Sequence, residues 1–87
     1  MNYKDVVDKY NMEDVRISTR IIDADDGGSP IFLIEGTESA LKMMSEIFLS
    51  AANDGQNGGF SISPKGAGRA YFSSSSTTGI YINRIES

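Results

Sequence analysis

The spacing of apolar residues changes along the chain, and each change marks a predicted element. Within residues 1–12 the spacing is that of a short amphipathic helix, whose apolar face carries Tyr3, Val6, Val7 and Tyr10. From Val15 to Ile21 apolar and polar residues alternate, which predicts a strand with one wet face. The uninterrupted apolar run Ile31–Ile34 predicts a strand covered on both faces. Residues 15–35 should therefore form a hairpin around an Asp- and Gly-rich turn.

A long amphipathic helix is predicted over residues 37–54. Thr37 is a suitable N-cap, and Glu38 in the first turn complements the positive end of the helix dipole. Lys42 and Glu46 have the spacing of an ion pair on the helix surface. The residues expected to face the core are Ala40, Leu41, Met44, Ile47, Phe48, Ala51 and Ala52.

The last part of the chain, residues 60–85, predicts three short strands. They are separated by a glycine-rich turn at 65–68 and a polar loop at 74–79, and residues 55–59 form a connector that begins at the helix-ending Gly55. The predicted class is α+β. We expect a single, mainly antiparallel sheet of about five strands, with the long helix packed on one face and the short helix at the amino terminus.

Composition and charge narrow the class of partner. A chain of 87 residues holds one domain, residues 1–87, with a small core. Its eight Lys and Arg are scattered singly and are outnumbered by twelve Asp and Glu, for a net charge of −4. This argues against nucleic acid and favours a basic protein as the partner. Cysteine is absent, and no apolar stretch has the length of a signal peptide or a membrane span. We therefore expect a cytoplasmic protein with no membrane partner.

The side chains needed for most catalytic chemistry are missing. Histidine and cysteine are absent, which removes the usual general base, the thiol nucleophile and most zinc ligands. The loop that starts at Asp23 resembles a calcium loop only superficially, because Ile34 stands where the bidentate Glu would be required. The sequence predicts no catalytic residue, no metal and no cofactor, so we expect a protein that is not an enzyme.

Two groups of residues are candidates for binding a protein. The carboxylates of the turn and of the helix start could form an acidic patch, which would attract Lys or Arg from a partner. Tyrosines on an open sheet face could anchor an interface, although a single exposed tyrosine is also ordinary on a protein surface. The candidate residues are Asp23, Asp25, Asp26, Glu35, Glu38, Tyr71 and Tyr81.

From about Ile31 onward the chain resembles the small immunity proteins of bacterial polymorphic and contact-dependent toxin systems. The resemblance rests on the strand, glycine and helix start of Phe32–Leu41, on the segment Phe60–Pro64 and on the closing Gly79–Ile82. It implies a cytoplasmic protein that neutralises a co-encoded toxin, often a basic nuclease, by covering its active site. The alternative is a structural or regulatory module of a bacterial or phage system that forms a homodimer through a sheet edge or the open face.

Overall fold

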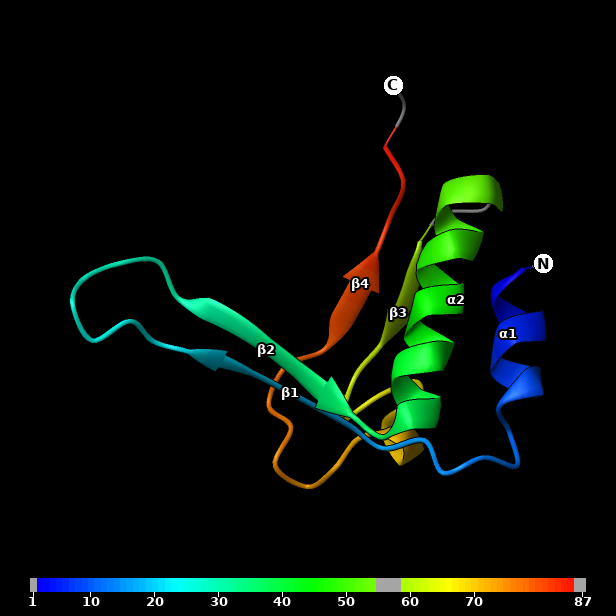
Figure 1. The fold of residues 1–87 in the computed structure, drawn as a ribbon, viewed down its shortest axis with the longest axis horizontal. Helices are drawn as coiled ribbons and strands as arrows, with labels where there is room; N and C mark the ends of the chain where they lie inside the picture. The colour runs from blue at the N-terminus through cyan, green and yellow to red at the C-terminus, as the bar shows by residue number, and fades with distance from the viewer. Residues whose placement is uncertain (1, 55–58, 86–87) are drawn as a thin grey trace.

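The computed structural model describes residues 2–54 and 59–85, which form two helices and two separate pairs of strands (Figure 1). β1 pairs with β2 and β3 pairs with β4, both antiparallel. The predicted α+β class is confirmed. Gly55 and the connector that follows it lie outside the described residues, apart from Gly59. The elements are α1 (Tyr3–Lys9), β1 (Ile17–Ile22), β2 (Ile31–Gly36), α2 (Glu38–Asp54), β3 (Phe60–Ile62), the 3-10 helix η1 (Arg69–Tyr71) and β4 (Ile80–Ile82).

The prediction of one five-stranded sheet is wrong, because the described strands form two sheets of two strands each. The strand expected after the glycine-rich turn is instead the 3-10 helix η1, which follows Gly68 in the left-handed conformation at φ 77°. Only Phe72 makes a strand-like bridge, to Ile17 of β1. The outer edge of β1 is thus occupied by irregular chain before β4 begins, and β4 pairs with β3 alone.

The serine-rich segment 73–78 forms hydrogen bonds with the backbone of β1, along the edge that faces away from β2. The Ser73 amide donates to the Ile17 carbonyl (2.7 Å), and the Thr77 amide donates to the Thr19 carbonyl (2.8 Å). The Ser76 hydroxyl donates to the Ile17 carbonyl (3.0 Å) and accepts from the Thr19 amide (3.2 Å). Since Thr19 is fully buried, these bonds satisfy backbone groups that water cannot reach. The predicted polar loop is therefore a structural cover for one strand edge.

The short helix α1 forms as predicted and packs against α2. Asn2 and Asp5 cap its first turn reciprocally, each side chain accepting a hydrogen bond from the backbone N–H of the other. Val6 and Tyr10 are buried in the core, and Tyr3 and Val7 pack against it from the rim. A helix this short is marginal in isolation, so its contact with α2 maintains it.

The long helix α2 begins where the sequence predicts, with a different face toward the core. The Thr37 hydroxyl accepts a hydrogen bond from the Ala40 amide (3.2 Å), which confirms the N-cap. Leu41, Phe48 and Ala52 are exposed, contrary to the predicted stripe. The reason is α1, which packs beside α2 and draws the adjacent side of the helix into the core. The buried residues are Ala40, Met43, Met44, Ile47, Ser50 and Ala51.

Glu46 of α2 joins the two helices. Its carboxylate accepts hydrogen bonds from Lys9 Nζ (2.8 Å) and from the Tyr10 hydroxyl. The hydrogen bond from Lys9, followed by that from Tyr10, lowers the pKa of the Glu46 carboxyl. The predicted Lys42–Glu46 pair is not formed, because Glu46 is engaged by α1. Lys42 instead lies 3.7 Å from the Glu38 carboxylate, one turn earlier.

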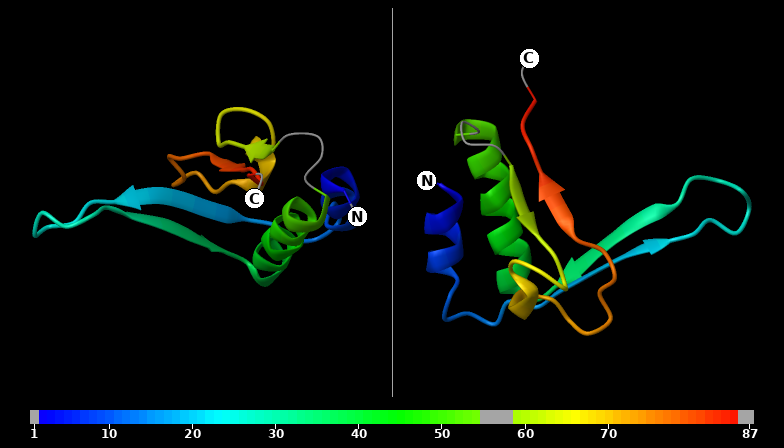
Figure 2. Two further views of the ribbon diagram at one scale, coloured as in Figure 1. Left: turned by 90° about the horizontal axis from the view of Figure 1, so that it is seen from above. Right: turned by 180° about the vertical axis from the view of Figure 1, so that it is seen from behind.

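The β1–β2 hairpin projects from the rest of the molecule, as Figure 2 shows from above and from behind. Its base is anchored by Ile17 and Thr19, which are buried, while the outer half of both strands is exposed. The prediction that Ile31–Ile34 is covered on both faces is wrong: in β2 only Leu33 is half-buried, and the other strand residues are exposed. No helix in the described part of the chain combines the length and apolar character needed to cross a membrane.

Candidate functional site

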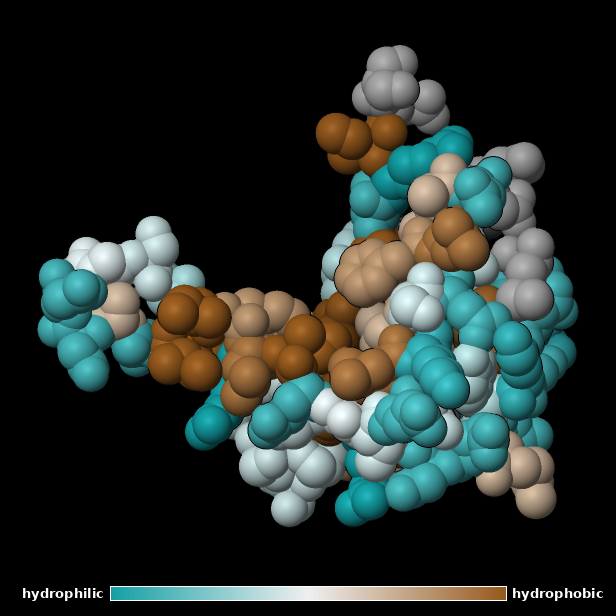
Figure 3. All heavy atoms as spheres, in the orientation of Figure 1, coloured by the Kyte–Doolittle hydropathy of each residue, from teal (hydrophilic) through white to brown (hydrophobic). Residues whose placement is uncertain are grey.

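The exposed half of the β1–β2 hairpin carries a group of large apolar side chains that we call the hairpin surface. Figure 3 shows hydrophobic atoms running along the hairpin to its junction with the body of the protein. Taking ~150–200 Å² for a fully exposed large side chain, the five side chains together expose roughly 400 Å², which is divided between the two faces of the hairpin. Its members are Ile21 (49% exposed), Ile22 (40%), Ile31 (61%), Phe32 (44%) and Ile34 (36%).

The register of the hairpin divides this surface between two faces. Ile21 lies opposite Phe32, and Thr19 lies opposite Ile34. Ile21, Phe32 and Ile34 therefore share the face whose base is buried in the core, whereas Ile22 and Ile31 pair on the other face. Both faces are apolar toward the tip, which is the pattern of a strand pair buried on both sides and not of a solvated hairpin.

The outer edge of β2 carries free backbone groups. The backbone of Ile17 and Thr19 hydrogen-bonds to residues 73–77, so the alternation of an antiparallel ladder directs Ser18 and Arg20 toward β2. The same alternation directs the N–H and C=O groups of Phe32 and Ile34 away from β1. Among the described residues no strand pairs with this edge. β2 is thus an exposed apolar edge strand, which is a template for pairing with another chain.

The acidic candidates separate into two groups at opposite ends of β2. Asp23, Asp25 and Asp26 are exposed in the loop that forms the tip of the hairpin. Within this loop the Gly28 amide donates to the Asp26 carboxylate (3.1 Å), and Gly27 adopts φ 78°. Glu35 and Glu38 are exposed at the other end, where β2 leads into α2. Since six residues of strand span about 20 Å, the five carboxylates do not form one patch.

The two candidate tyrosines are not neighbours on a sheet face. Tyr71 ends the 3-10 helix η1 and packs partly against the core. Tyr81 lies on β4 and is 69% exposed, with its ring close to the backbone of Gly59. The shared tyrosine surface expected from the sequence required a strand at residues 69–73, and that strand is absent. Tyr81 alone remains available to a partner.

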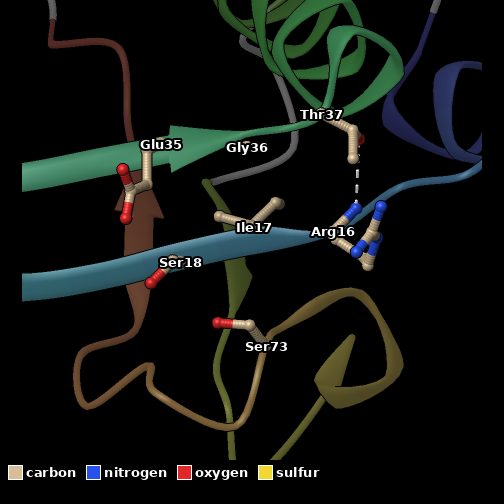
Figure 4. Close-up of a pocket in the computed structure, with 7 residues that line it drawn as sticks. All are labelled: Arg16, Ile17, Ser18, Glu35, Gly36, Thr37 and Ser73. Carbon is tan, nitrogen blue, oxygen red and sulfur yellow. Dashed lines mark hydrogen bonds between the residues drawn. The ribbon is translucent and has the colours of Figure 1, made fainter.

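A shallow hollow of about 330 Å³ lies at the base of the hairpin (Figure 4). The Glu35 carboxylate and the Ser18 hydroxyl lie on the same side of the hairpin there, and the Arg16 amide donates to the Thr37 hydroxyl (3.3 Å). The Arg16 guanidinium is held by Asp14 (2.9 Å), and this hydrogen bond lowers the pKa of the Asp14 carboxyl. The lining residues are Arg16, Ile17, Ser18, Glu35, Gly36, Thr37 and Ser73.

This hollow lacks the elements of an acid–base or nucleophilic site. Among the described residues Glu35 is the one carboxylate that lines it, and the hydroxyls of Ser18 and Ser73 hydrogen-bond to other serines and not to Glu35. In residues 2–54 and 59–85 no three acidic side chains gather closely enough to hold a metal ion. The arrangement offers surface contacts and the free edge of β2.

The hairpin surface was not foreseen as a site from the sequence. Its residues have the composition of a buried strand, and the pattern therefore predicted core. The available signal was quantitative: a chain of 87 residues with one long helix has little apolar surface left to cover both faces of a projecting strand pair.

Comparisons of the chain with protein families, with curated proteins and with solved structures found no match.

Proposed function

We propose that this chain is a non-catalytic protein-binding domain of the immunity type, which neutralises a bacterial toxin in the cytoplasm by direct contact. The observation that carries the proposal is the hairpin surface, where five large apolar side chains project from the body of the protein. Large apolar side chains that are grouped and exposed in this way are typical of interaction sites in soluble proteins. A projecting hairpin can also enter a concave site, as an inhibitor of an enzyme must.

The charge of the hairpin fits a basic partner. Asp23, Asp25 and Asp26 lie at its tip, ahead of the apolar side chains. In an approach tip first, these carboxylates meet the partner's Lys and Arg before the apolar residues are desolvated. A toxin that binds nucleic acid carries such a basic surface around its active site. The chain's net charge of −4 adds a favourable long-range field.

The resemblance to immunity proteins supports the same proposal. Its main stretch, Phe32–Leu41, corresponds to β2, the Thr37 cap and the first turn of α2. This strand–helix junction supports the hairpin and sets the direction in which it projects. The toxin, the mode of inhibition and the bacterial or phage source belong to the proposal.

Co-expression tests the proposal. The chain is produced together with the toxin domain encoded beside its gene, and growth of the host is measured. The wild-type chain should restore growth, and the double variant Phe32→Thr, Ile34→Thr should not. Leu49→Thr is the control, because Leu49 is a large apolar residue on α2 that is even more exposed (59%) than Phe32 (44%) and Ile34 (36%). Toxicity that persists with the wild-type chain would overturn the proposal, as would rescue by the double variant.

A complex of the chain with its toxin would allow the role of the tip carboxylates to be tested separately. The double variant Asp25→Lys, Asp26→Lys should slow association with a basic toxin and weaken the dependence of association on salt. Dissociation should change less, because the tip is exposed and the apolar contacts persist. Unchanged association kinetics would show that the tip is not part of the interface.

A further inference from the structure

The unpaired edge of β2 has the features of a strand that takes another strand. Charged side chains, prolines and bulges are the usual devices that keep edge strands apart; β2 has a single charged residue, Glu35, near its end, and no internal proline or bulge. The backbone groups of Phe32 and Ile34 point outward along this edge, as the bonding of β1 to residues 73–77 requires. Pro30, just before the strand, limits such a ladder at one end because it has no N–H to donate.

We infer that the occupant of this edge is the β2 strand of a second copy of the chain. The two copies would pair antiparallel about a two-fold axis at Leu33, and the two hairpins would become one four-stranded sheet. This inference goes beyond the proposed function, since such a dimer can form whether or not the chain binds a toxin.

The sequence of β2 is self-complementary in this register. Phe32 of one copy lies opposite Ile34 of the other, and Leu33 lies opposite Leu33. Glu35 faces an apolar residue, Ile31, and lies four residues, or about 13 Å, along the strands from the second Glu35. The acidic tips point in opposite directions. No like charges are therefore brought together.

Neighbouring registers are less favourable. Centring the pair on Phe32 places Ile34 opposite Pro30, which removes a donor from the ladder. Centring it on Ile34 brings the two Glu35 carboxylates to about half their separation, two residues apart along the strands. The register at Leu33 keeps every outward N–H of Phe32 and Ile34 paired.

The area favours a reversible dimer. Edge-to-edge pairing buries the outward backbone of both β2 strands and the adjoining sides of Phe32, Leu33 and Ile34, but it leaves Ile21 and Ile22 of β1 outside the contact. The interface is therefore smaller than the ~1,200 Å² of stable specific complexes. Self-association should therefore be weak, with the dimer populated only well above micromolar concentration. Because both copies carry a net charge of −4, added salt should strengthen the dimer, whereas salt weakens the contact of an acidic tip with a basic toxin. The two proposals therefore fail independently.

Single-cysteine variants test the register, since the chain contains no cysteine. Leu33 occupies the non-hydrogen-bonded pair on the axis, where the Cα atoms lie about 4.5 Å apart, within the range of a disulfide. Under mild oxidation Leu33→Cys should give roughly tenfold more cross-linked dimer than Ile31→Cys, whose partner cysteine would lie about 13 Å away. Ile31 is the matched control because it stands on the same strand and the same face.

Sedimentation of the unmodified protein completes the test. The average mass should rise from 9.4 kDa toward twice that value as concentration increases, and Ile34→Lys, which adds a charge to the edge, should keep the protein monomeric. Circular dichroism checks that the variant is folded. A wild-type chain that stays monomeric at millimolar concentration overturns the inference, even if another protein binds β2. Equal cross-linking of the two cysteine variants overturns it as well.

Discussion

Ile21 and Phe32 face each other across the β1–β2 hairpin, and both are about half exposed, at 49% and 44%. Two residues earlier on β1, on the same face, Thr19 is fully buried. This face of the hairpin thus passes from the core to solvent within two residues, although the side chains on its exposed part are apolar. The outer half of the hairpin carries large apolar side chains of the kind found in a protein core, and these side chains are exposed to solvent.

The first prediction concerns the two halves of that hairpin. Ile17→Ala should cost about 2–5 kcal/mol of unfolding free energy, because Ile17 is 1% exposed and a cavity would remain in the core. Phe32→Ala should cost less than about 1 kcal/mol in the monomer, because its ring is already half solvated. Urea denaturation of dilute protein measures both. Equal losses would mean that the outer half is as well packed as the base.

The second prediction concerns the cover of the β1 edge. Ser76→Ala removes the hydrogen bonds of its hydroxyl with the Ile17 carbonyl and the Ser73 hydroxyl, and it leaves the buried Thr19 amide without its acceptor, so about 1–3 kcal/mol should be lost. Amide exchange of Thr19 should accelerate accordingly. Ser74→Ala is the control, because Ser74 is exposed and its hydroxyl makes no hydrogen bond with the described residues. If Ser76→Ala and Ser74→Ala behave alike, the serine-rich segment does not hold β1.

The third prediction concerns the junction of β2 with α2. The Thr37 hydroxyl caps the helix through Ala40 and donates to the Asp14 carbonyl (2.5 Å). Thr37→Ala should therefore destabilise the protein by about 1–2 kcal/mol. Thr37→Ser retains the hydroxyl and should recover most of the loss. Thermal unfolding compares the three proteins, and a serine variant as unstable as the alanine variant would contradict the capping role.

The fourth prediction is a pH dependence. Lys9 and Tyr10 lower the pKa of Glu46 below its usual value of 4.5, so the charged carboxylate is favoured in the folded state. Its contribution is complete above the unfolded pKa and is lost as pH falls through the lower folded pKa. Glu46→Gln should flatten the decline of stability in this acid range. Lys9→Met should flatten it too, since Lys9 donates the bond that lowers the pKa most.

In the basic range stability changes with pH in the opposite direction, because it falls as the pH rises. Hydrogen bonding to Glu46 raises the pKa of Lys9 above 10.5, and it also raises that of Tyr10. The stability that these groups contribute is present below their unfolded pKa values and declines as pH rises through the folded values. At pH values between the acid and the basic range, this cluster should add no pH dependence to the unfolding free energy of the wild-type protein. A Glu46→Gln variant that follows the wild type in acid would contradict the role of the cluster.

Local signals in the sequence predicted most elements correctly. Periodicity located α1, α2 and the hairpin, and the N-cap at Thr37 followed from residue type alone. These features depend on neighbours within one or two turns, which the sequence shows directly. The face of α2 depends on a distant contact, since α1 determines that Met43 is buried while Phe48 is exposed.

The arrangement of strands could not be predicted in the same way. Residues 69–73 have the alternation of a strand, yet Gly68 begins a 3-10 helix and serine side chains bond the edge of β1 instead. An apolar run such as Ile31–Ile34 shows that a strand is suited to burial, not that the rest of the chain is large enough to bury it. The hairpin surface became visible only in the assembled fold.

Amide hydrogen exchange across the whole chain is the most direct test of the central claim, that the open edge of β2 takes up a second strand. The amides of Phe32 and Ile34 should exchange rapidly in dilute protein, because they face outward from β2. Raising the concentration should slow the exchange of these two amides selectively, as a second strand covers them. Exchange on β2 that is independent of concentration, with new protection around Tyr81 on the β3–β4 sheet instead, would contradict the account.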